Sequence, residues 1–271
     1  MTLTHIAAVD IDAFWSSLRG EAERASAREP ILAGFFEYAI LRHDGFAAAL
    51  GAYLSSKIGN AELSELVLQD QARAVYGAVP AVVFAAIADL RASRERNPAY
   101  VDHITPFLYF KGYQALQLHR IGHELWKQGR HELATYLQSR VSEAFGVDIH
   151  PAARLGIRIF IDHATGIVIG ETAVVGNDVS ILQGVTLGGT GKETGDRHPK
   201  VGSGVLLSAG AKVLGNITIG EGARIGAGSV VLKAVPAHTT AVGIPARIVG
   251  MEVGEEAPAL SMDQQFWDYE I

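Results

Sequence analysis

The chain has 271 residues, of which 48% are hydrophobic and 19% charged, a composition typical of a soluble globular protein. No apolar run approaches the ~18–20 residues that a membrane-spanning helix needs, and the N-terminus lacks the basic start of a signal peptide. The absence of cysteine excludes disulfides and thiolate metal ligands. We therefore expect a cytoplasmic protein without a membrane anchor.

The net charge of −6 is concentrated at the C-terminus. Residues 251–271 contain acidic but no basic side chains, and in the rest of the chain acidic and basic residues are equal in number. The body of the protein therefore has no excess of the basic charge that nucleic acids or anionic membranes attract, and we expect neither as a partner. Residues 251–271 are predicted to form a flexible acidic tail.

Residues 1–145 are predicted to form an all-helical N-terminal domain of six to eight helices. In "HELATYLQSRVSEAF" the residues Leu133, Leu137, Val141 and Phe145 recur every four positions and form one apolar stripe. The stretch "PAVVFAAIADLRAS" has the same periodicity. We assign packing or surface roles to His43, His119, His123 and His131 in this half.

After Gly146 the helical periodicity gives way to an internal repeat of six residues. Aliphatic residues recur at every sixth position, with one shift of phase and one break, at Ile149, Leu155, Ile161, Ile169, Val175, Ile181, Leu187, Val201, Leu207, Val213, Ile219, Ile225 and Val231. One buried aliphatic position per six residues predicts a parallel β-helix, in which three units form a coil of about 18 residues. The sequence thus predicts an α+β protein whose second domain spans residues 146–250.

The break in the repeat is the stretch "GGTGKETGDRHPK", residues 188–200. It contains no aliphatic residue and cannot form part of a coil, so we expect an excursion loop projecting from the β-helix. Its glycines, its basic residues and His198 favour a functional role, because loops on a rigid scaffold are where function concentrates.

Three stretches place polar side chains where the coils should be apolar: "VDIHPAARLG", "IDHATG" and "GDRHPK". Asp148 and His163 are fifteen residues apart, close to one coil length, so adjacent coils could bring them together, and Asp162 precedes His163. A histidine oriented by a carboxylate is a recurrent general base, although a structural hydrogen bond explains such a pair equally well. His150, His163 and His198 are not closely spaced, and we expect no metal.

These stretches resemble those of the bacterial serine O-acetyltransferases. The similarity extends through "DHATGIVIGETAVVGNDVSILQGVTLGGTGKETGDRHPK", "VPAHTTAVGIPARIVG" and, in the helical half, "TPFLYFKGYQALQLHRIGHELW". It implies a left-handed β-helix, trimers that pair into hexamers, and transfer of an acetyl group from acetyl-CoA to the hydroxyl of L-serine. It also implies that this reaction is the first step of cysteine biosynthesis, with L-cysteine as a feedback inhibitor.

The resemblance assigns roles to the polar residues of the repeat. His163 matches the general base of the family, and Asp148 matches the carboxylate that orients it. Asp162 matches a ligand of the substrate ammonium group, while Arg197 and His198 match residues of the substrate-binding loop.

Four further matches concern acetyl-CoA. Gly189, beside Thr190 in "LGGTGK", resembles the backbone donor near the thioester. Ala209 and Ala227 fall where the family places the pantetheine arm along a groove between coils.

One position departs from the family pattern. The family usually has Arg-Asp-Pro-Ala before "TPFLY", whereas this chain has Asn97 in place of that aspartate. Asparagine keeps an acceptor oxygen but loses the charge, so we expect weaker binding of the substrate ammonium group and weaker inhibition by cysteine. Asp102 is a candidate to compensate.

The C-terminus carries a further match. The chain ends "QQFWDYEI", and in the family the terminal isoleucine, here Ile271, enters the active site of O-acetylserine sulfhydrylase. The resemblance therefore implies that enzyme as a partner, captured through the terminal carboxylate.

Other functions remain open from the sequence. A hexapeptide acetyltransferase acting on a sugar or an antibiotic hydroxyl explains the coils, but it explains neither the large helical domain nor "GDRHPK". A hexapeptide carbonic anhydrase needs clustered zinc histidines. A non-catalytic scaffold would show no dependence on His163.

Overall fold

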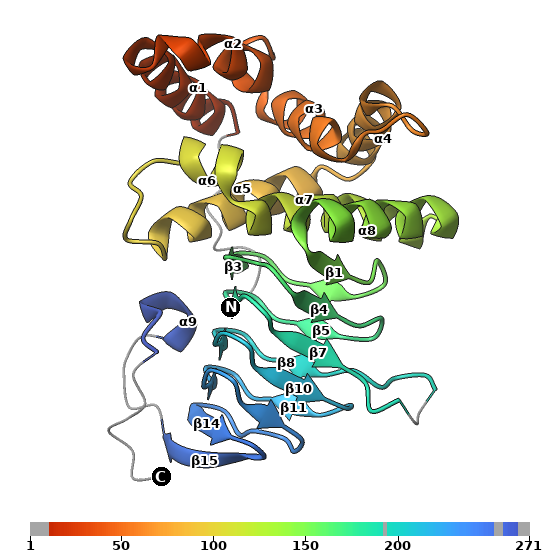
Figure 1. The fold of residues 1–271 in the computed structure, drawn as a ribbon, viewed down its shortest axis with the longest axis vertical. Helices are drawn as coiled ribbons and strands as arrows, with labels where there is room; N and C mark the ends of the chain where they lie inside the picture. Colours follow the sequence, from red (N-terminus) through yellow and green to blue (C-terminus); the bar gives the residue numbers. More distant parts are fainter. Residues whose placement is uncertain (1–10, 192–193, 252–256, 265–271) are drawn as a thin grey trace.

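The computed structural model describes residues 11–191, 194–251 and 257–264, in which helices are layered on one end of a three-sided β-helix (Figure 1). The N-terminal part of this described chain forms α-helices joined in one place by short 3₁₀ and π segments. In chain order they are α1 (Ile11–Arg28), η2 (Pro30–Leu32), α2 (Ala33–Phe36), η3 (Glu37–Leu41), α3 (Phe46–Ile58), α4 (Glu65–Ala78), α5 (Ala81–Glu95), α6 (Ile104–Tyr109), α7 (Lys111–Lys127) and α8 (His131–Phe145).

The apolar stripe predicted for 131–145 faces the core. Leu137, Val141 and Phe145 on α8 are buried, and Leu133 packs against the same core. Each fully buried aliphatic side chain contributes about 1.5–3 kcal/mol relative to an exposed one, so this stripe stabilises α8 more than helix propensity does. In the part of the chain that the structure describes, no single helix is long and apolar enough to cross a membrane. Only α4 and α5 taken together reach that composition, and they are bent by 102°.

The β-helix has three faces of stacked parallel strands. Face 1 consists of β1 (Val147–Ile149), β4 (Ile167–Ile169), β7 (Thr186–Gly188), β10 (Lys212–Leu214) and β13 (Val230–Val231). Face 2 consists of β2 (Arg154–Leu155), β5 (Val174–Val175), β8 (Lys200–Val201) and β11 (Thr218–Ile219). Face 3 consists of β3 (Phe160–Asp162), β6 (Ser180–Leu182), β9 (Leu206–Leu207), β12 (Arg224–Ile225), β14 (Thr239–Gly243) and the antiparallel β15 (Ala246–Met251).

The predicted hexapeptide positions form the core of this β-helix. On face 1, for example, Ile149 pairs in register with Ile169, which in turn pairs with Leu187. All thirteen predicted aliphatic positions are buried except Leu155, which is partly buried. The predicted fold class, a helical region followed by a parallel β-helix, is confirmed. The excursion lies between β7, which ends at Gly188, and β8, which begins at Lys200, and it projects from the coils (Figure 1).

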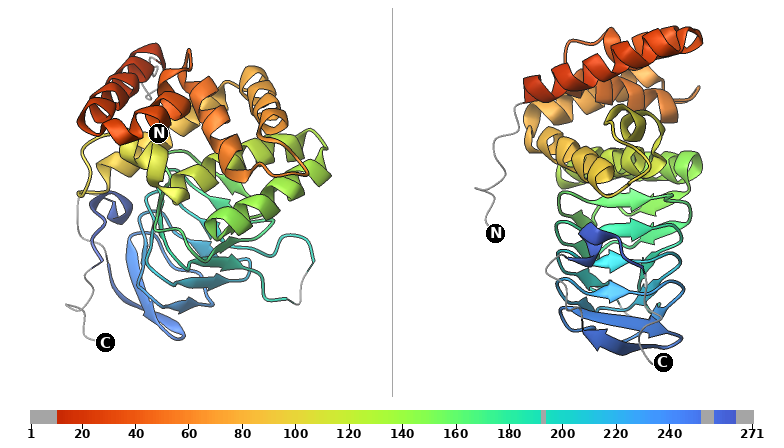
Figure 2. Two further views of the ribbon diagram at one scale, coloured as in Figure 1. Left: turned by 45° about the horizontal axis from the view of Figure 1, so that its top comes forward. Right: turned by 90° about the vertical axis from the view of Figure 1, so that its left-hand side faces the viewer.

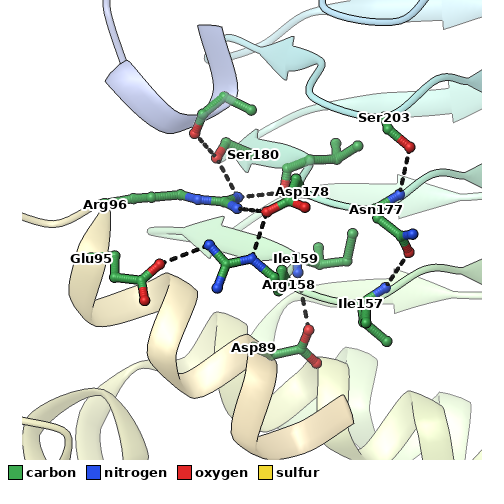
Figure 3. Close-up of polar contacts among 12 residues, drawn as sticks. Asp89, Glu95, Arg96, Ile157, Arg158, Ile159, Asn177, Asp178, Ser180 and Ser203 are labelled. Atoms are coloured by element: carbon green, nitrogen blue, oxygen red, sulfur yellow. Dashed lines mark hydrogen bonds and ion pairs between the residues drawn. The ribbon is translucent and has the colours of Figure 1, made fainter. Parts of the chain in front are cut away.

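A buried ion pair joins the helices to the first coil. Asp89 on α5 accepts hydrogen bonds from Arg120 Nε at 2.8 Å, from Gln117 Nε2 at 3.0 Å and from the backbone N–H of Ile159 at 3.0 Å. Figure 3 shows Asp89 pointing from its helix toward Ile159 in the coil. Because Arg120 and Gln117 lie on α7 and Ile159 lies in the first coil, this carboxylate links the helices to the β-helix.

The segment after the β-helix differs from the prediction of a flexible tail. Helix α9 (Pro258–Ser261) lies against face 3 (Figure 2), where Ala259 is fully buried. Ser180 Oγ donates to Ala259 O at 2.7 Å, and Ala259 N–H donates to Gly204 O at 3.3 Å. Composition did not reveal this docking because the small apolar run "APAL" is short and its partners lie far away in sequence.

Candidate active site

The predicted general base, His163, lies at the corner where the chain turns from face 3 to face 1. Its side chain is 75% exposed, and Nε2 lies 3.7 Å from Oδ2 of Asp162, the last residue of β3. His163 and Ala164 have φ values of 55° and 61°, a conformation that is costly for residues other than glycine and often found at functional sites. The turn leaves the imidazole open to solvent.

Asp148 lies in the middle of β1, on face 1, beside Val168 of β4. Its Oδ1 accepts a 2.6 Å hydrogen bond from Nε2 of Gln138 on α8. Among the described residues no hydrogen bond or ion pair joins Asp148 to His163, so the predicted dyad is brought to neighbouring coils without direct contact in the structure.

A second cluster lies at the corner between face 1 and face 2, where the excursion returns to the coil. Arg197 Nη2 donates to Glu171 Oε2 at 2.8 Å. His198 is only 7% exposed, and its ring lies over Gly170, where a Cβ atom would be 2.1 Å from Nε2. Burial, together with the charge of Arg197, lowers the pKa of His198 below its usual value. Thr172 contacts both loop residues through its hydroxyl.

The predicted acetyl-CoA residues divide between the two corners. Ala209 and Ala227 lie at the same corner as His163, one coil apart, where Gly228 N–H donates to Ala209 O at 2.8 Å. Gly189 and Thr190 lie at the other corner. A Cβ at Gly189 would be 3.5 Å from Arg197, and one at Gly215 would be 3.3 Å from Thr190.

Asn97 follows α5 and caps a turn with its own side chain. Its Oδ1 accepts the backbone N–H of Ala99 at 3.0 Å, and the structure shows no contact between Asn97 and Asp162 or His163. Asp102 is engaged in another way, because its Oδ1 accepts the backbone N–H of Thr105 at 2.8 Å and caps α6. Neither side chain is therefore joined to the His163 corner within one chain.

The two corners are separated by face 1. Strand β4 alone, with three residues, spans about 10 Å between them. Within the described ranges, no hydrogen bond or ion pair connects His163 with Arg197 or His198. Ile271 lies outside the described residues.

Sequence reasoning missed several residues that hold these groups. Gln138 supports Asp148, Lys111 Nζ donates to Thr165 Oγ1 in the turn after His163, and Thr172 organises the excursion. The signal for Thr172 was its place in "GETA", two residues after the glycine that makes room for the histidine ring. No signal pointed to Gln138, because only tertiary packing places α8 beside β1.

Helix α7 carries a His-x-x-x-His pair that was not recognised in the sequence. His119 and His123 are four residues apart on α7, with ring centroids 5.9 Å apart. Within the part of the chain that is described, no three His, Asp or Glu side chains are arranged to hold a metal ion.

An exposed histidine beside a carboxylate, on a β-helix of hexapeptide units, defines a hexapeptide-repeat acyltransferase. The family model "Serine acetyltransferase, N-terminal" matches residues 14–118, and "Bacterial transferase hexapeptide (six repeats)" matches residues 198–233. The serine acetyltransferase of Escherichia coli K12 is 51% identical over 257 residues, covering 95% of this chain and 94% of the relative. The chain belongs to the serine acetyltransferase family and is an acyltransferase.

Solved structures agree with this assignment. A serine acetyltransferase from Vibrio cholerae has a TM-score of 0.91 at 53% identity, covering 93% of this chain and 97% of its own. A serine acetyltransferase in complex with cysteine has a TM-score of 0.91 at 51% identity, with coverage of 93% and 98%. Two others are complexes: one from Brucella abortus with coenzyme A (TM-score 0.86, 50% identity, coverage 88% and 95%) and one from soybean with serine (0.85, 53%, 87% and 97%).

Proposed function

We propose that this chain transfers the acetyl group of acetyl-CoA to the hydroxyl of L-serine, producing O-acetyl-L-serine and CoA. The observation that carries the proposal is the exposed His163 beside Asp162, at the corner between face 3 and face 1. Ala209 and Ala227 lie at the same corner in later coils. Relatives that are about half identical have been solved with coenzyme A and with serine, which supports these two substrates.

In this mechanism His163 accepts the proton of the serine hydroxyl while the oxygen attacks the thioester carbonyl. The tetrahedral intermediate then expels the CoA sulfur, which takes the proton back from the imidazolium. Base assistance of this kind is worth about 10²–10⁴-fold in rate, because an alcohol is a weak nucleophile at neutral pH. We assign Asp148 to orient the imidazole and the backbone N–H of Gly189 to stabilise the oxyanion, a contribution worth about 10²–10³-fold.

The amino acid is recognised at both of its charged ends. Asp162 binds the ammonium group, and Arg197 and His198 bind the carboxylate. Asn97 adds an uncharged acceptor where the family has a carboxylate. L-Cysteine differs from serine only in its side-chain atom, so the same contacts make it a competitive feedback inhibitor, as the cysteine complex of a relative suggests. We further assign the enzyme to the first step of cysteine biosynthesis and to the cytoplasm.

We infer that the complete site forms between copies in a trimer, two of which pair as a hexamer. The residues assigned to the base and to the carboxylate lie at different corners of one chain, with face 1 between them. When three copies of a three-sided β-helix pack around a threefold axis, one corner of each copy contacts a different corner of the next. The ring then closes with no copy of this contact left unpaired.

Mixing two inactive variants tests this assembly. His163→Asn and His198→Ala chains, denatured and refolded together in equal amounts, should regain about one quarter of wild-type activity. In randomly assembled trimers, about one quarter of the interfaces pair an intact His163 corner of one chain with an intact His198 corner of its neighbour. Each variant refolded alone is the control. No recovery in a mixture shown to exchange subunits means that each chain supplies its own complete site.

Acceptor specificity is tested by thiol release from acetyl-CoA with L-serine, L-homoserine, a galactoside and chloramphenicol. Serine should be preferred, with His163→Asn nearly inactive on it. Turnover of the sugar or antibiotic instead of serine would assign the alternative hexapeptide acetyltransferase reaction.

We also propose that Ile271 binds O-acetylserine sulfhydrylase. A terminal carboxylate captured by backbone donors, next to an apolar side chain in a pocket, is a known recognition mode. Deleting Ile271 should weaken binding by more than ~3 kcal/mol, as for a central hot spot, and leave acetyl transfer unchanged. Isothermal titration of full-length and truncated chains measures this, and equal affinities would mean that the terminus is not the contact.

A further inference from the structure

Thr172, at the corner between face 1 and face 2, is bonded to Arg197 and His198 of the excursion at four points, and its carbonyl oxygen also accepts from Lys200 Nζ at 2.9 Å. Its Oγ1 accepts the backbone N–H of Arg197 at 3.0 Å and that of His198 at 3.1 Å. The same Oγ1 lies 2.9 Å from Nδ1 of His198, and the backbone N–H of Thr172 donates to that Nδ1 at 3.1 Å. No other residue described in the structure contacts the His198 ring nitrogens by hydrogen bonds.

These contacts determine the protonation of the ring. Because an N–H of Thr172 points at Nδ1, this nitrogen must be the acceptor, and the neutral ring carries its proton on Nε2. The two lone pairs of Thr172 Oγ1 face two backbone N–H groups, so its own hydrogen points either at Nδ1 of His198 or at the carboxylate of Asp196, and in both cases Nδ1 accepts from the backbone N–H of Thr172. Protonating Nδ1 would break this bond.

The donor edge of the ring is left free. Nε2 lies over Gly170, where a side chain would collide with it, and among the described residues no hydrogen bond to Nε2 is seen. The charged groups around the ring are Arg197 and Lys200 on the excursion, and Glu171 and His150 on the coils above. The two cations oppose protonation of His198 and Glu171 favours it, while burial lowers its pKa further.

We propose that Thr172 is a positioning residue that holds His198 as a neutral imidazole with its proton on Nε2, presenting this N–H to the carboxylate of the amino-acid substrate. The proposal rests on the proposed function for the identity of that anion, but the tautomer itself is a property of the free protein. The opposite neutral tautomer would turn an Nε2 lone pair toward the carboxylate and repel it. Thr172 thereby keeps Nε2 a donor to the serine carboxylate whether or not Nδ1 is protonated.

The test compares Thr172→Val, which has the shape of threonine without the hydroxyl, with Thr172→Ser, which retains it. In the wild type and in Thr172→Ser, the KM for serine should show no dependence on the ionisation of His198. Thr172→Val keeps the backbone N–H that faces Nδ1 but loses the acceptor for the backbone N–H groups of Arg197 and His198, so the ring is no longer held against that N–H. The KM for serine should then rise by about two- to tenfold at high pH, the range expected for one lost hydrogen bond. The rise should vanish at low pH, where both ring nitrogens carry a proton, and kcat should change less.

The tautomer is read separately from ¹⁵N shifts of histidine-labelled protein, with His198 assigned by difference from His198→Gln. Wild type must show a protonated Nε2 and an unprotonated Nδ1. A protonated Nδ1 in the wild type, which can be measured even if Thr172→Val fails to fold, would overturn the proposal. So would a pH-independent KM in folded Thr172→Val.

The two hypotheses fail differently. If His198→Ala leaves the affinity for serine in titration calorimetry unchanged while the wild-type tautomer is as stated, the loop does not bind serine and the proposed role of His198 is wrong, but the action of Thr172 on the ring stands.

Discussion

The side-chain amide of Gln138 on α8 donates a 2.6 Å hydrogen bond to Oδ1 of Asp148 on β1. This bond runs from the helical layer to the carboxylate assigned to orient His163. It holds one oxygen of Asp148 and leaves Oδ2 without a hydrogen bond within the described residues. The helical domain therefore supports the catalytic coil directly, through a side chain that no motif contains.

Gln138→Met should lower kcat by about three- to tenfold, because the lost hydrogen bond no longer holds Asp148 in one rotamer. The KM for serine should hardly change, since Gln138 touches no residue assigned to the amino acid. Steady-state kinetics measure this, with Ser139→Ala on the exposed side of the same helix as control. An unchanged kcat would show that Asp148 needs no support from α8.

His163→Asn should lower kcat by at least ~10²-fold and leave the melting temperature unchanged. Asparagine is the suitable replacement, because it tolerates the positive φ at this corner better than alanine does. The side chain is largely exposed, so its loss removes little packing. Near wild-type turnover by the folded variant would contradict the assignment of His163 as base.

Asn97→Asp should tighten the binding of both serine and cysteine by about two- to fivefold, the effect of one partly exposed charge pair. The turn should be preserved, since a carboxylate accepts the N–H of Ala99 as an amide oxygen does. Titration calorimetry with each amino acid measures the change. Unaltered affinities would place Asn97 outside the pocket.

Ser180→Ala should loosen the docked helix α9. Ser180 Oγ donates to Ala259 O and accepts from Arg96 Nη1 at 3.1 Å, so it links α9 to the end of α5 (Figure 3). Amide hydrogen exchange over residues 259–262 should accelerate by about two- to tenfold. Ser203→Ala is the matched control, because that hydroxyl accepts from Asn177 and, among the described residues, has no hydrogen bond to α9. Equal exchange in both variants would show that Ser180 does not hold the helix.

Asp89→Asn should destabilise the fold by about 3–5 kcal/mol, because it leaves the Arg120 guanidinium buried without its counter-charge. Asp70→Asn is the control: its partner Arg73 is exposed, and such a pair is worth about 0–1 kcal/mol. Chemical denaturation of both variants gives the comparison. A similar loss in the two would mean that the ion pair at the junction is solvated.

The sequence by itself determined the fold class and the family. A β-helix coil buries one aliphatic side chain per six residues, so a local six-residue period in the sequence predicts it, as Ile169, Val175 and Ile181 illustrate. The excursion was predictable for the same reason, since a stretch without aliphatic residues cannot close a coil. Helix α8 was predictable from the stripe that ends at Phe145.

Tertiary structure alone decided how the site residues are distributed. His163 and His198 both belong to the polar motifs that interrupt the repeat, yet they lie at different corners of the β-helix, because the chain moves to the next face about every six residues. The contacts of Gln138 with Asp148 and of Ser180 with Ala259 join residues whose pairing has no local period. Such contacts depend on where whole elements pack, and hydrogen bonds between side chains from separate elements leave no repeating pattern in the sequence.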